Sequence, residues 1–191
     1  MSSRSRRTQG LYLILVGAAF AVEGVIQLGH PAYWDAVTDF DYAAVWTHSL
    51  VLLLVAPALI ILVRQAQAGR AATVIACIMA AGAVLSGFAN AVEDGFHLKS
   101  FGTLYVIGAA SYAYGMILLA ILLGLGARKA FALVPALVAV GLIGTDIGGA
   151  ILVGATWAIF GILVLTGRTE PDPSESDPAA PGPPTGALSP T

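Results

Sequence analysis

The stretch of sequence that decides the fold is residues 130–167, AFALVPALVAVGLIGTDIGGAILVGATWAIFGILVLTG. It is almost entirely apolar, and it is too long for one crossing of a bilayer, which takes about 20 residues. Only Thr145–Gly149 interrupts it. Glycine tolerates turn dihedrals, and Asp146 can cap a following helix. We therefore predict two short helices, at residues 130–144 and 149–167.

Four further apolar segments, each long enough to cross a bilayer, precede this stretch. The whole chain of 191 residues is 58% hydrophobic and only 10% charged, with a mean hydropathy of +0.85. Soluble domains carry about 25% charged residues. We therefore predict an all-α integral membrane bundle of six transmembrane helices, the first four at residues 10–28, 44–63, 71–91 and 102–124.

The basic residues give an independent test of this count, because cytoplasmic loops collect Lys and Arg. In the six-helix arrangement only Lys99 falls on the outer side. The split at Thr145–Gly149 is needed for this result, since two crossings must separate Lys129 from Arg168. We therefore expect a multi-pass protein of the cell membrane, with both termini cytoplasmic. The residues on the inner side are Arg4, Arg6, Arg7, Arg64, Arg70, Arg128, Lys129 and Arg168.

The two ends of the chain differ from the apolar middle. Residues 1–9 are predicted to form a basic cytoplasmic N-terminus. Ser5-Arg6-Arg7 before an apolar run is also found in signal peptides, but further membrane segments follow, so we expect it to be retained. Residues 169–191 are rich in Pro, Ser and acids and predict a disordered cytoplasmic tail. The excess of Arg over Lys suggests a GC-rich bacterial source and thus a bacterial inner membrane.

Inserting an ionisable side chain into the centre of a bilayer costs about 2.5–3.5 kcal/mol of free energy, so each such residue is a candidate for a functional role. Glu23 is predicted to lie some five residues below the outer end of the first helix, about 8 Å deep at 1.5 Å per residue. Gln27 and His30 follow at i+4 and i+7 and share its helix face. Glu23 is therefore the first candidate for an intramembrane functional residue, although bonding Gln27 or a neighbouring helix is an equally good explanation.

The third segment has a similar polar face. Asn90, Glu93, Asp94 and His97 follow one another at helical spacing if the helix continues beyond Val92. If the helix ends there, His97 belongs to a loop. In the fourth segment two tyrosines share a face and either line a cavity or pack in the core with a hydrogen-bonded hydroxyl; they are Tyr105 and Tyr112.

All three histidines and most of the embedded acids fall near the outer face. Imidazole and carboxylate bind zinc, iron or copper and also relay protons. No HxxxH, HxxE or CxxC spacing occurs, so a structural role is favoured over a metal site. Haem is not expected, because no second histidine lies one or two turns deeper. The transport candidates are Glu23, Gln27, Asn90 and Asp146; the metal candidates are His30, His48, Glu93, Asp94 and His97.

Three functions remain open. The favoured one is a small non-enzymatic membrane component that acts through partners or self-association. The second is a transporter of protons, ions or a small solute that uses Glu23. The third is a metal-dependent membrane enzyme. The chain has no phosphate-binding loop, nucleophile elbow or zincin motif, so no catalytic residue is predicted and an enzyme is disfavoured. The net charge of −2 points to no nucleic acid partner, leaving lipid and further copies of the chain.

Overall fold

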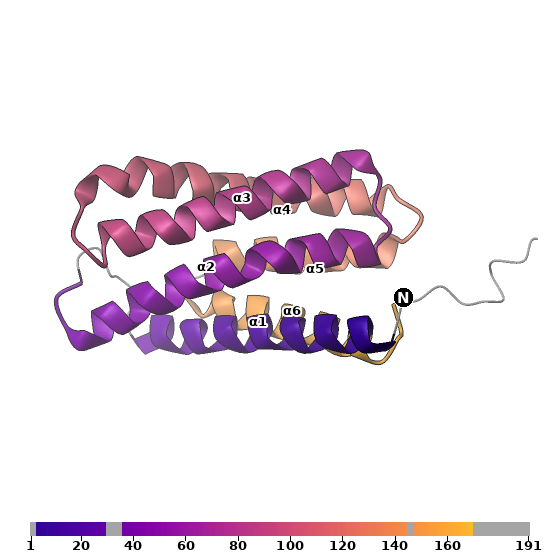
Figure 1. Cartoon of the computed structure of the whole chain (residues 1–191), viewed down its shortest axis with the longest axis horizontal. Helices are drawn as coiled ribbons and strands as arrows, with labels where there is room; N and C mark the ends of the chain where they lie inside the picture. The colour runs from indigo at the N-terminus through magenta and orange to yellow at the C-terminus, as the bar shows by residue number, and fades with distance from the viewer. Residues whose placement is uncertain (1–2, 30–35, 145–146, 170–191) are drawn as a thin grey trace, which may run out of the picture.

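The protein is an all-helical bundle, which confirms the all-α part of the predicted fold class (Figure 1). The computed structural model describes residues 3–29, 36–144 and 147–169, and this part of the chain contains no β-strand. Short 3-10 turns, η1 and η2, precede two of the helices. The elements are α1 (Ser3–Gly29), α2 (Asp39–Gln65), α3 (Arg70–Glu93), η1 (Lys99–Phe101), α4 (Gly102–Gly124), η2 (Lys129–Ala132), α5 (Leu133–Ile143) and α6 (Gly149–Leu165).

The helices follow one another around a closed ring. Each helix packs against the next in sequence, and α6 packs against α1 to close the circle. Consecutive helices run in opposite directions, so that α1 begins and α6 ends at the same end of the bundle (Figure 1). One continuous apolar core lies inside, with Leu13, Val55, Met79, Met116 and Trp157 among its fully buried side chains.

Glycines allow the ring to close between α1 and α6. Gly10, Gly17 and Gly24 recur every seventh residue on α1, and at each a Cβ would lie within 2.9 Å of α6. Gly154 and Gly161 of α6 face them in the same way. Small residues at this spacing let two helix backbones approach closely, which is how membrane helices commonly associate.

The predicted break in the long apolar stretch is present. Helix α5 ends at Ile143 and α6 begins at Gly149, whose amide nitrogen donates to the Gly144 carbonyl oxygen over 2.7 Å. Gly148 adopts a left-handed conformation with φ of +85°. Gly148 occupies the N-cap position of α6, without a side-chain cap. Residues 145–146 themselves lie outside the described residues.

Several helix ends differ from the predicted ones. Helix α1 begins at Ser3, so the basic N-terminal residues continue the first helix instead of preceding it. Helix α2 begins at Asp39, where Thr38 and Asp41 form a reciprocal capping box. Hydropathy alone misses such polar turns, because they carry no apolar signal. The predicted tail lies almost wholly outside the described residues, which end at Thr169.

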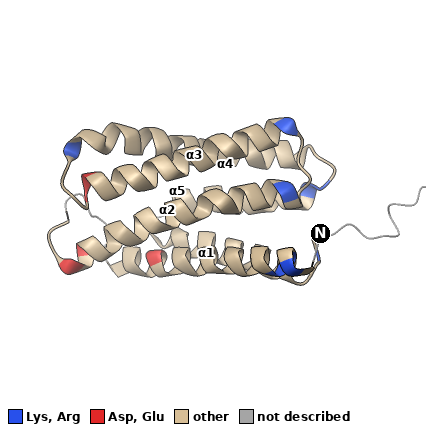
Figure 2. Ribbon diagram, in the orientation of Figure 1, with Lys and Arg blue, Asp and Glu red and all other residues tan. Residues whose placement is uncertain are grey.

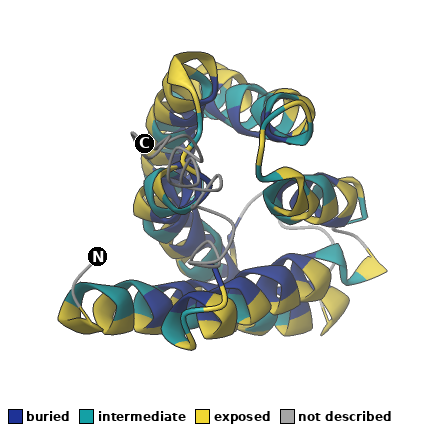
Figure 3. Cartoon of the chain, turned by 90° about the vertical axis from the view of Figure 1, so that its right-hand side faces the viewer, coloured by how far each residue is buried: buried dark blue, intermediate teal, exposed yellow. Residues whose placement is uncertain are grey.

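Four of the helices, α1 to α4 with η1, are long and apolar enough to cross a membrane, and α5 and α6 are shorter apolar helices. Viewed along the bundle, the buried positions face inward and the exposed ones lie on the outer surface (Figure 3). That outer surface is rich in large apolar side chains such as Leu15, Val25, Ile78, Val106 and Ile121. This is the pattern of a membrane protein, whose outside faces lipid.

Charge divides the bundle into two ends (Figure 2). Basic residues gather where α1, α3 and α5 begin, and acidic residues gather at the opposite end, where α2 and α4 begin and where Lys99 of η1 is the one basic residue among the described ones. At the basic end, Gln65 Nε2 donates to Gln9 Oε1 over 2.8 Å, and the Arg128 guanidinium donates to the carbonyl oxygens of Gln65 and Thr169. These bonds tie α1, α2 and the end of α6 to the α4–α5 turn.

Candidate functional site

The buried carboxylate of Glu23 is the starting point of the site. Glu23 lies on α1 toward the acidic end of the bundle and is only 4% exposed. Gln27, one turn further along, donates from Nε2 to Glu23 Oε1 over 3.0 Å. The predicted shared face of these two residues is therefore confirmed. Their supposed third member, His30, lies outside the described residues.

His48 of α2 contacts the same carboxylate oxygen. The distance from His48 Nδ1 to Glu23 Oε1 is 2.5 Å, and the His48 side chain is one-quarter exposed. This contact joins α1 to α2 within the bundle. Charge-assisted hydrogen bonds are the short and strong ones, and burial strengthens them further.

Tyr105 of α4 completes the arrangement. Its hydroxyl lies 3.2 Å from His48 Nε2, so both imidazole nitrogens are hydrogen-bonded. We call Gln27, Glu23, His48 and Tyr105 the Glu23 cluster. The cluster combines an acid, an imidazole and a phenol from three helices. The sequence singled out each member, but it could not show that they meet, because helix faces alone do not determine which helices are neighbours.

A second set of hydrogen bonds links α2, α3 and α4. Asn90 Nδ2 donates to Ser49 Oγ over 2.9 Å and to the Val45 carbonyl oxygen over 3.2 Å. Ser86 Oγ donates to the Tyr105 carbonyl oxygen over 3.3 Å. Asn90 is thus positioned as a link between helices, a common role for polar side chains in membrane bundles. Ser49 was not singled out from the sequence, because serine carries no distinctive spacing signal.

His97 does not continue the polar face of α3. The helix ends at Glu93, and His97 lies in the following loop with φ of +57°, which settles the two alternatives in favour of the loop. Its Nε2 atom lies 2.8 Å from the Tyr42 hydroxyl. Histidine is among the few residues other than glycine that adopt such a left-handed conformation with some frequency.

The metal candidates do not converge in the described part of the chain, where no three His, Cys, Asp or Glu side chains come together to hold a metal ion. The Glu23 cluster occupies both nitrogens of His48, and His97 pairs with Tyr42. The Glu93 carboxylate lies against the start of α4, 2.6 Å from where a Gly102 Cβ would be. A carboxylate at a helix N-terminus is stabilising in itself.

Several buried polar atoms near the cluster have no hydrogen-bond partner among the described residues. They include Glu23 Oε2 and Gln27 Oε1, and also the Tyr112 hydroxyl and Trp157 Nε1. Buried polar atoms normally find a partner, so each exception calls for an explanation. The core that contains Met79 is mainly apolar, so the hydrogen-bonded cluster reaches from the acidic end only part of the way through the bundle.

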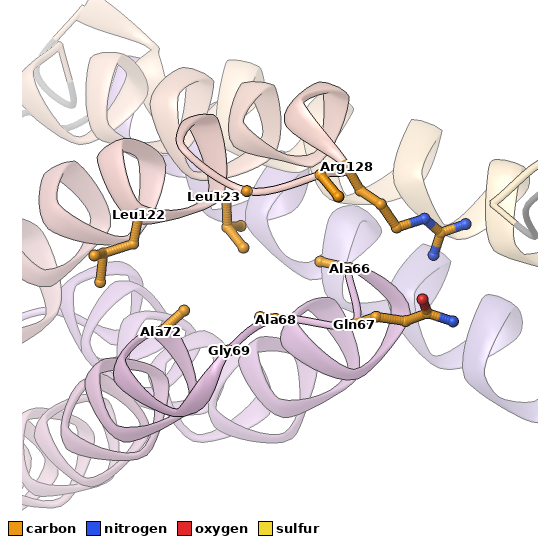
Figure 4. Close-up of a pocket in the computed structure, with 10 residues that line it drawn as sticks. Ala66, Gln67, Ala68, Gly69, Ala72, Leu122, Leu123 and Arg128 are labelled. Carbon is orange, nitrogen blue, oxygen red and sulfur yellow. The ribbon is translucent and has the colours of Figure 1, made fainter.

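A pocket at the basic end offers no comparable chemistry. It lies between the α2–α3 and α4–α5 turns and has a cavity volume of about 180 Å³ (Figure 4). Ala66, Ala72 and Leu123 give it apolar walls, and Arg128 is its only charged lining residue. Because Arg128 already donates to two backbone carbonyl oxygens, its guanidinium has a structural role. The Glu23 cluster is therefore the better candidate site.

Comparison with protein-family models, with curated proteins and with solved structures gives no match for this chain. The geometry of the bundle and of the Glu23 cluster is therefore what indicates a function. Asp146, the remaining transport candidate, lies outside the described residues.

Proposed function

We propose that this is a six-span protein of the cell membrane with both termini in the cytoplasm. The clustering of basic residues at the end of the bundle where α1 begins supports this orientation, because positive residues stay on the cytoplasmic side. Helix α6 has 17 residues, which is at the lower limit of about 17–25 for a crossing. Helix α5 is shorter still, and local thinning of the bilayer accommodates such segments at modest cost.

Cysteine labelling tests this topology. Cys77 is first replaced by alanine, and single cysteines are then introduced as Ser100→Cys, Ile147→Cys and Ala127→Cys. With a membrane-impermeant maleimide on intact cells, we expect labelling at positions 100 and 147, and labelling at position 127 only after lysis. Labelling at 100 without labelling at 147 would show that α5 and α6 do not cross the membrane.

We further propose that the protein couples the uptake and release of a proton to the transport of an ion or small solute. One observation carries this proposal: a buried carboxylate, Glu23, shares a short hydrogen bond with the partly exposed imidazole of His48. Acidic and imidazole side chains at membrane depth form the proton relays of pumps and transporters. Tyr105 extends the chain of exchangeable protons by one group.

The apolar core beneath the cluster limits the mechanism. A proton or solute that reaches Glu23 from the acidic end meets mainly apolar side chains deeper in the described core. Transport through one chain then needs a second conformation that opens the cluster to the basic end. Assembly of several copies into a homo-oligomer would provide another way to complete the path, and a chain of 191 residues favours it.

The test is charge movement in reconstituted membranes. Protein in proteoliposomes on a solid support receives a step in external pH, and the transient current is recorded. We expect a current from the wild type that Glu23→Gln abolishes. Asp39→Asn is the matched control, because it removes an exposed carboxylate at the same end of the bundle and outside the cluster.

A wild-type current equal to that of empty liposomes would overturn proton coupling. The non-enzymatic component acting through partners would then be the better proposal, and it predicts that Glu23→Gln leaves the phenotype of the cell unchanged. The metal-dependent enzyme makes a separate prediction. It requires about one equivalent of zinc, iron or copper in the purified protein, which elemental mass spectrometry measures directly.

A further inference from the structure

The two unpartnered oxygens of the Glu23 cluster suggest what the site binds. Glu23 Oε2 and Gln27 Oε1 are both buried acceptors without a partner among the described residues, and their side chains are only 4% and 8% exposed. Their other polar atoms bond each other, Gln27 Nε2 to Glu23 Oε1. The unpartnered atoms therefore belong to one joined carboxylate–amide unit, and neither can donate a hydrogen bond when Glu23 is ionised.

The hydrogen bonds also indicate the charge of the cluster. An ionised Glu23 accepts from His48 Nδ1, which must then carry a proton. With a neutral imidazole, Nε2 accepts from the Tyr105 hydroxyl, and every bond of the chain has one donor and one acceptor. In this state the buried cluster carries one uncompensated negative charge. Such a charge is costly in a low-dielectric interior, so a positive charge has to neutralise it.

The groups that face the cluster supply no positive charge. In the described residues, α5 and α6 contain no ionisable side chain. Helix α4 adds the phenols of Tyr105 and Tyr112, and α3 adds Glu93 and the neighbouring Asp94, whose negative charges act on the cluster through space. The remaining choices are an extra proton on the Glu23–His48 pair or a bound cation.

We propose that the Glu23 cluster binds a monovalent alkali cation through Glu23 Oε2 and Gln27 Oε1, in competition with an extra proton on the Glu23–His48 pair. Carboxylate and amide oxygens are the hard ligands that such cations prefer. A single buried carboxylate is neutralised by one positive charge, whereas a divalent ion would leave an excess. Water from the side of His48, which is one-quarter exposed, completes the coordination shell.

Competition follows because both ligands neutralise the same charge. A cation at Glu23 Oε2 neutralises the charge that the extra proton on the Glu23–His48 pair would otherwise neutralise, so that proton is released. By linkage, the proton weakens cation binding by the same factor. This inference depends on the proposed proton coupling and names the ion that is exchanged for the proton.

The experiment measures proton release from purified protein in weakly buffered detergent with a pH indicator. Addition of NaCl or KCl is compared with addition of choline chloride at equal ionic strength. We expect the alkali salt to release up to about one proton per chain near neutral pH, and choline to release none. The comparison between Na⁺ and K⁺ shows which ion fits the site.

Variants assign the effect to the proposed oxygens. Gln27→Leu removes Oε1 and keeps the Glu23–His48 pair. At the same concentration of alkali cation, this variant should release at least tenfold fewer protons per chain than the wild type. Gln9→Leu makes the same substitution at the basic end of α1, outside the cluster, and should behave as the wild type. Circular dichroism confirms that each variant is folded.

The wild-type measurement of proton release tests the cation site even if Gln27→Leu does not fold. Equal proton signals from alkali and choline salts, at pH values where the Glu23-dependent current is present, would overturn the cation site and leave proton coupling intact. Absence of both the cation effect and the Glu23-dependent current would overturn both proposals.

Discussion

Gly17 of α1 and Gly154 of α6 touch through their backbones in a reciprocal contact. A Cβ on Gly17 would lie 2.6 Å from the Gly154 carbonyl oxygen, and a Cβ on Gly154 would lie 2.6 Å from the Gly17 carbonyl oxygen. Real Cβ atoms essentially never come so close to backbone, so neither position accepts a larger side chain without separating the helices. This contact closes the ring and fixes the position of α1, which carries Glu23.

Gly17→Ala should therefore destabilise the bundle. The added methyl overpacks a backbone contact, which costs about 1–3 kcal/mol. Thermal unfolding in detergent, followed by circular dichroism, measures the loss. Gly124→Ala is the control: it adds the same methyl near the end of α4, where the nearest atom, Ala132 Cβ, is 3.8 Å away. Equal stability of the two variants would contradict the tight α1–α6 contact.

The turn between α5 and α6 depends on the left-handed conformation of Gly148. Gly148→Ala forces an L-residue to φ of +85°, where the cost is about 1–2 kcal/mol. Gly148→Asn should recover part of that stability, because asparagine visits this region more readily than alanine does. Gly144→Ala meets only ordinary contacts at 3.5 Å and should be tolerated. If unfolding temperatures do not separate Gly148→Ala from Gly144→Ala, the turn geometry is wrong.

Much of this fold could be predicted from the sequence because lipid exposure makes hydropathy a direct signal. The long apolar segments and the glycine-rich break at residues 145–149 show this well. The polar helix starts could not be predicted in that way, since a capping box such as that of Thr38 depends on hydrogen bonds. The closure of α6 against α1 was also beyond the sequence, because many apolar arrangements satisfy the same pattern.

The candidate site was predictable only residue by residue. The spacing of Glu23 and Gln27 on one helix predicted their bond, since i and i+4 side chains face each other. The contact of Glu23 with His48, and that of His48 with Tyr105, requires knowing which helices are neighbours and at which depth. For His97 the sequence left a helix and a loop open, because spacing does not show where a helix ends; α3 ends at Glu93, so His97 lies in the loop.

Arg128 should matter far more than the adjacent Lys129. Arg128→Met leaves the carbonyl oxygens of Gln65 and Thr169 without their charged donor, and such hydrogen bonds are worth about 1.5–3 kcal/mol. Lys129→Met removes the same charge from an exposed position and should stay within about 0.5 kcal/mol of the wild type. Because both variants lose one positive charge at the same end of the bundle, any effect on topology is matched. Equal unfolding temperatures would show that the Arg128 bonds contribute nothing.

The Glu23–His48 pair should behave as a coupled unit in a double-mutant cycle. His48→Leu alone leaves the buried Glu23 carboxylate without its partner. Breaking a buried pair in this way costs about 3–5 kcal/mol of stability. The lower part of that range is expected, because His48 is one-quarter exposed. Adding Glu23→Leu removes the stranded charge, so the double variant should be more stable than His48→Leu alone and close to the wild type. Denaturant unfolding in mixed micelles measures the free energy of unfolding of the wild type, the two single variants and the double variant. Additive effects of the two substitutions would mean that the 2.5 Å contact carries no coupling energy, and the proton-binding role assigned to the pair would lose its physical basis.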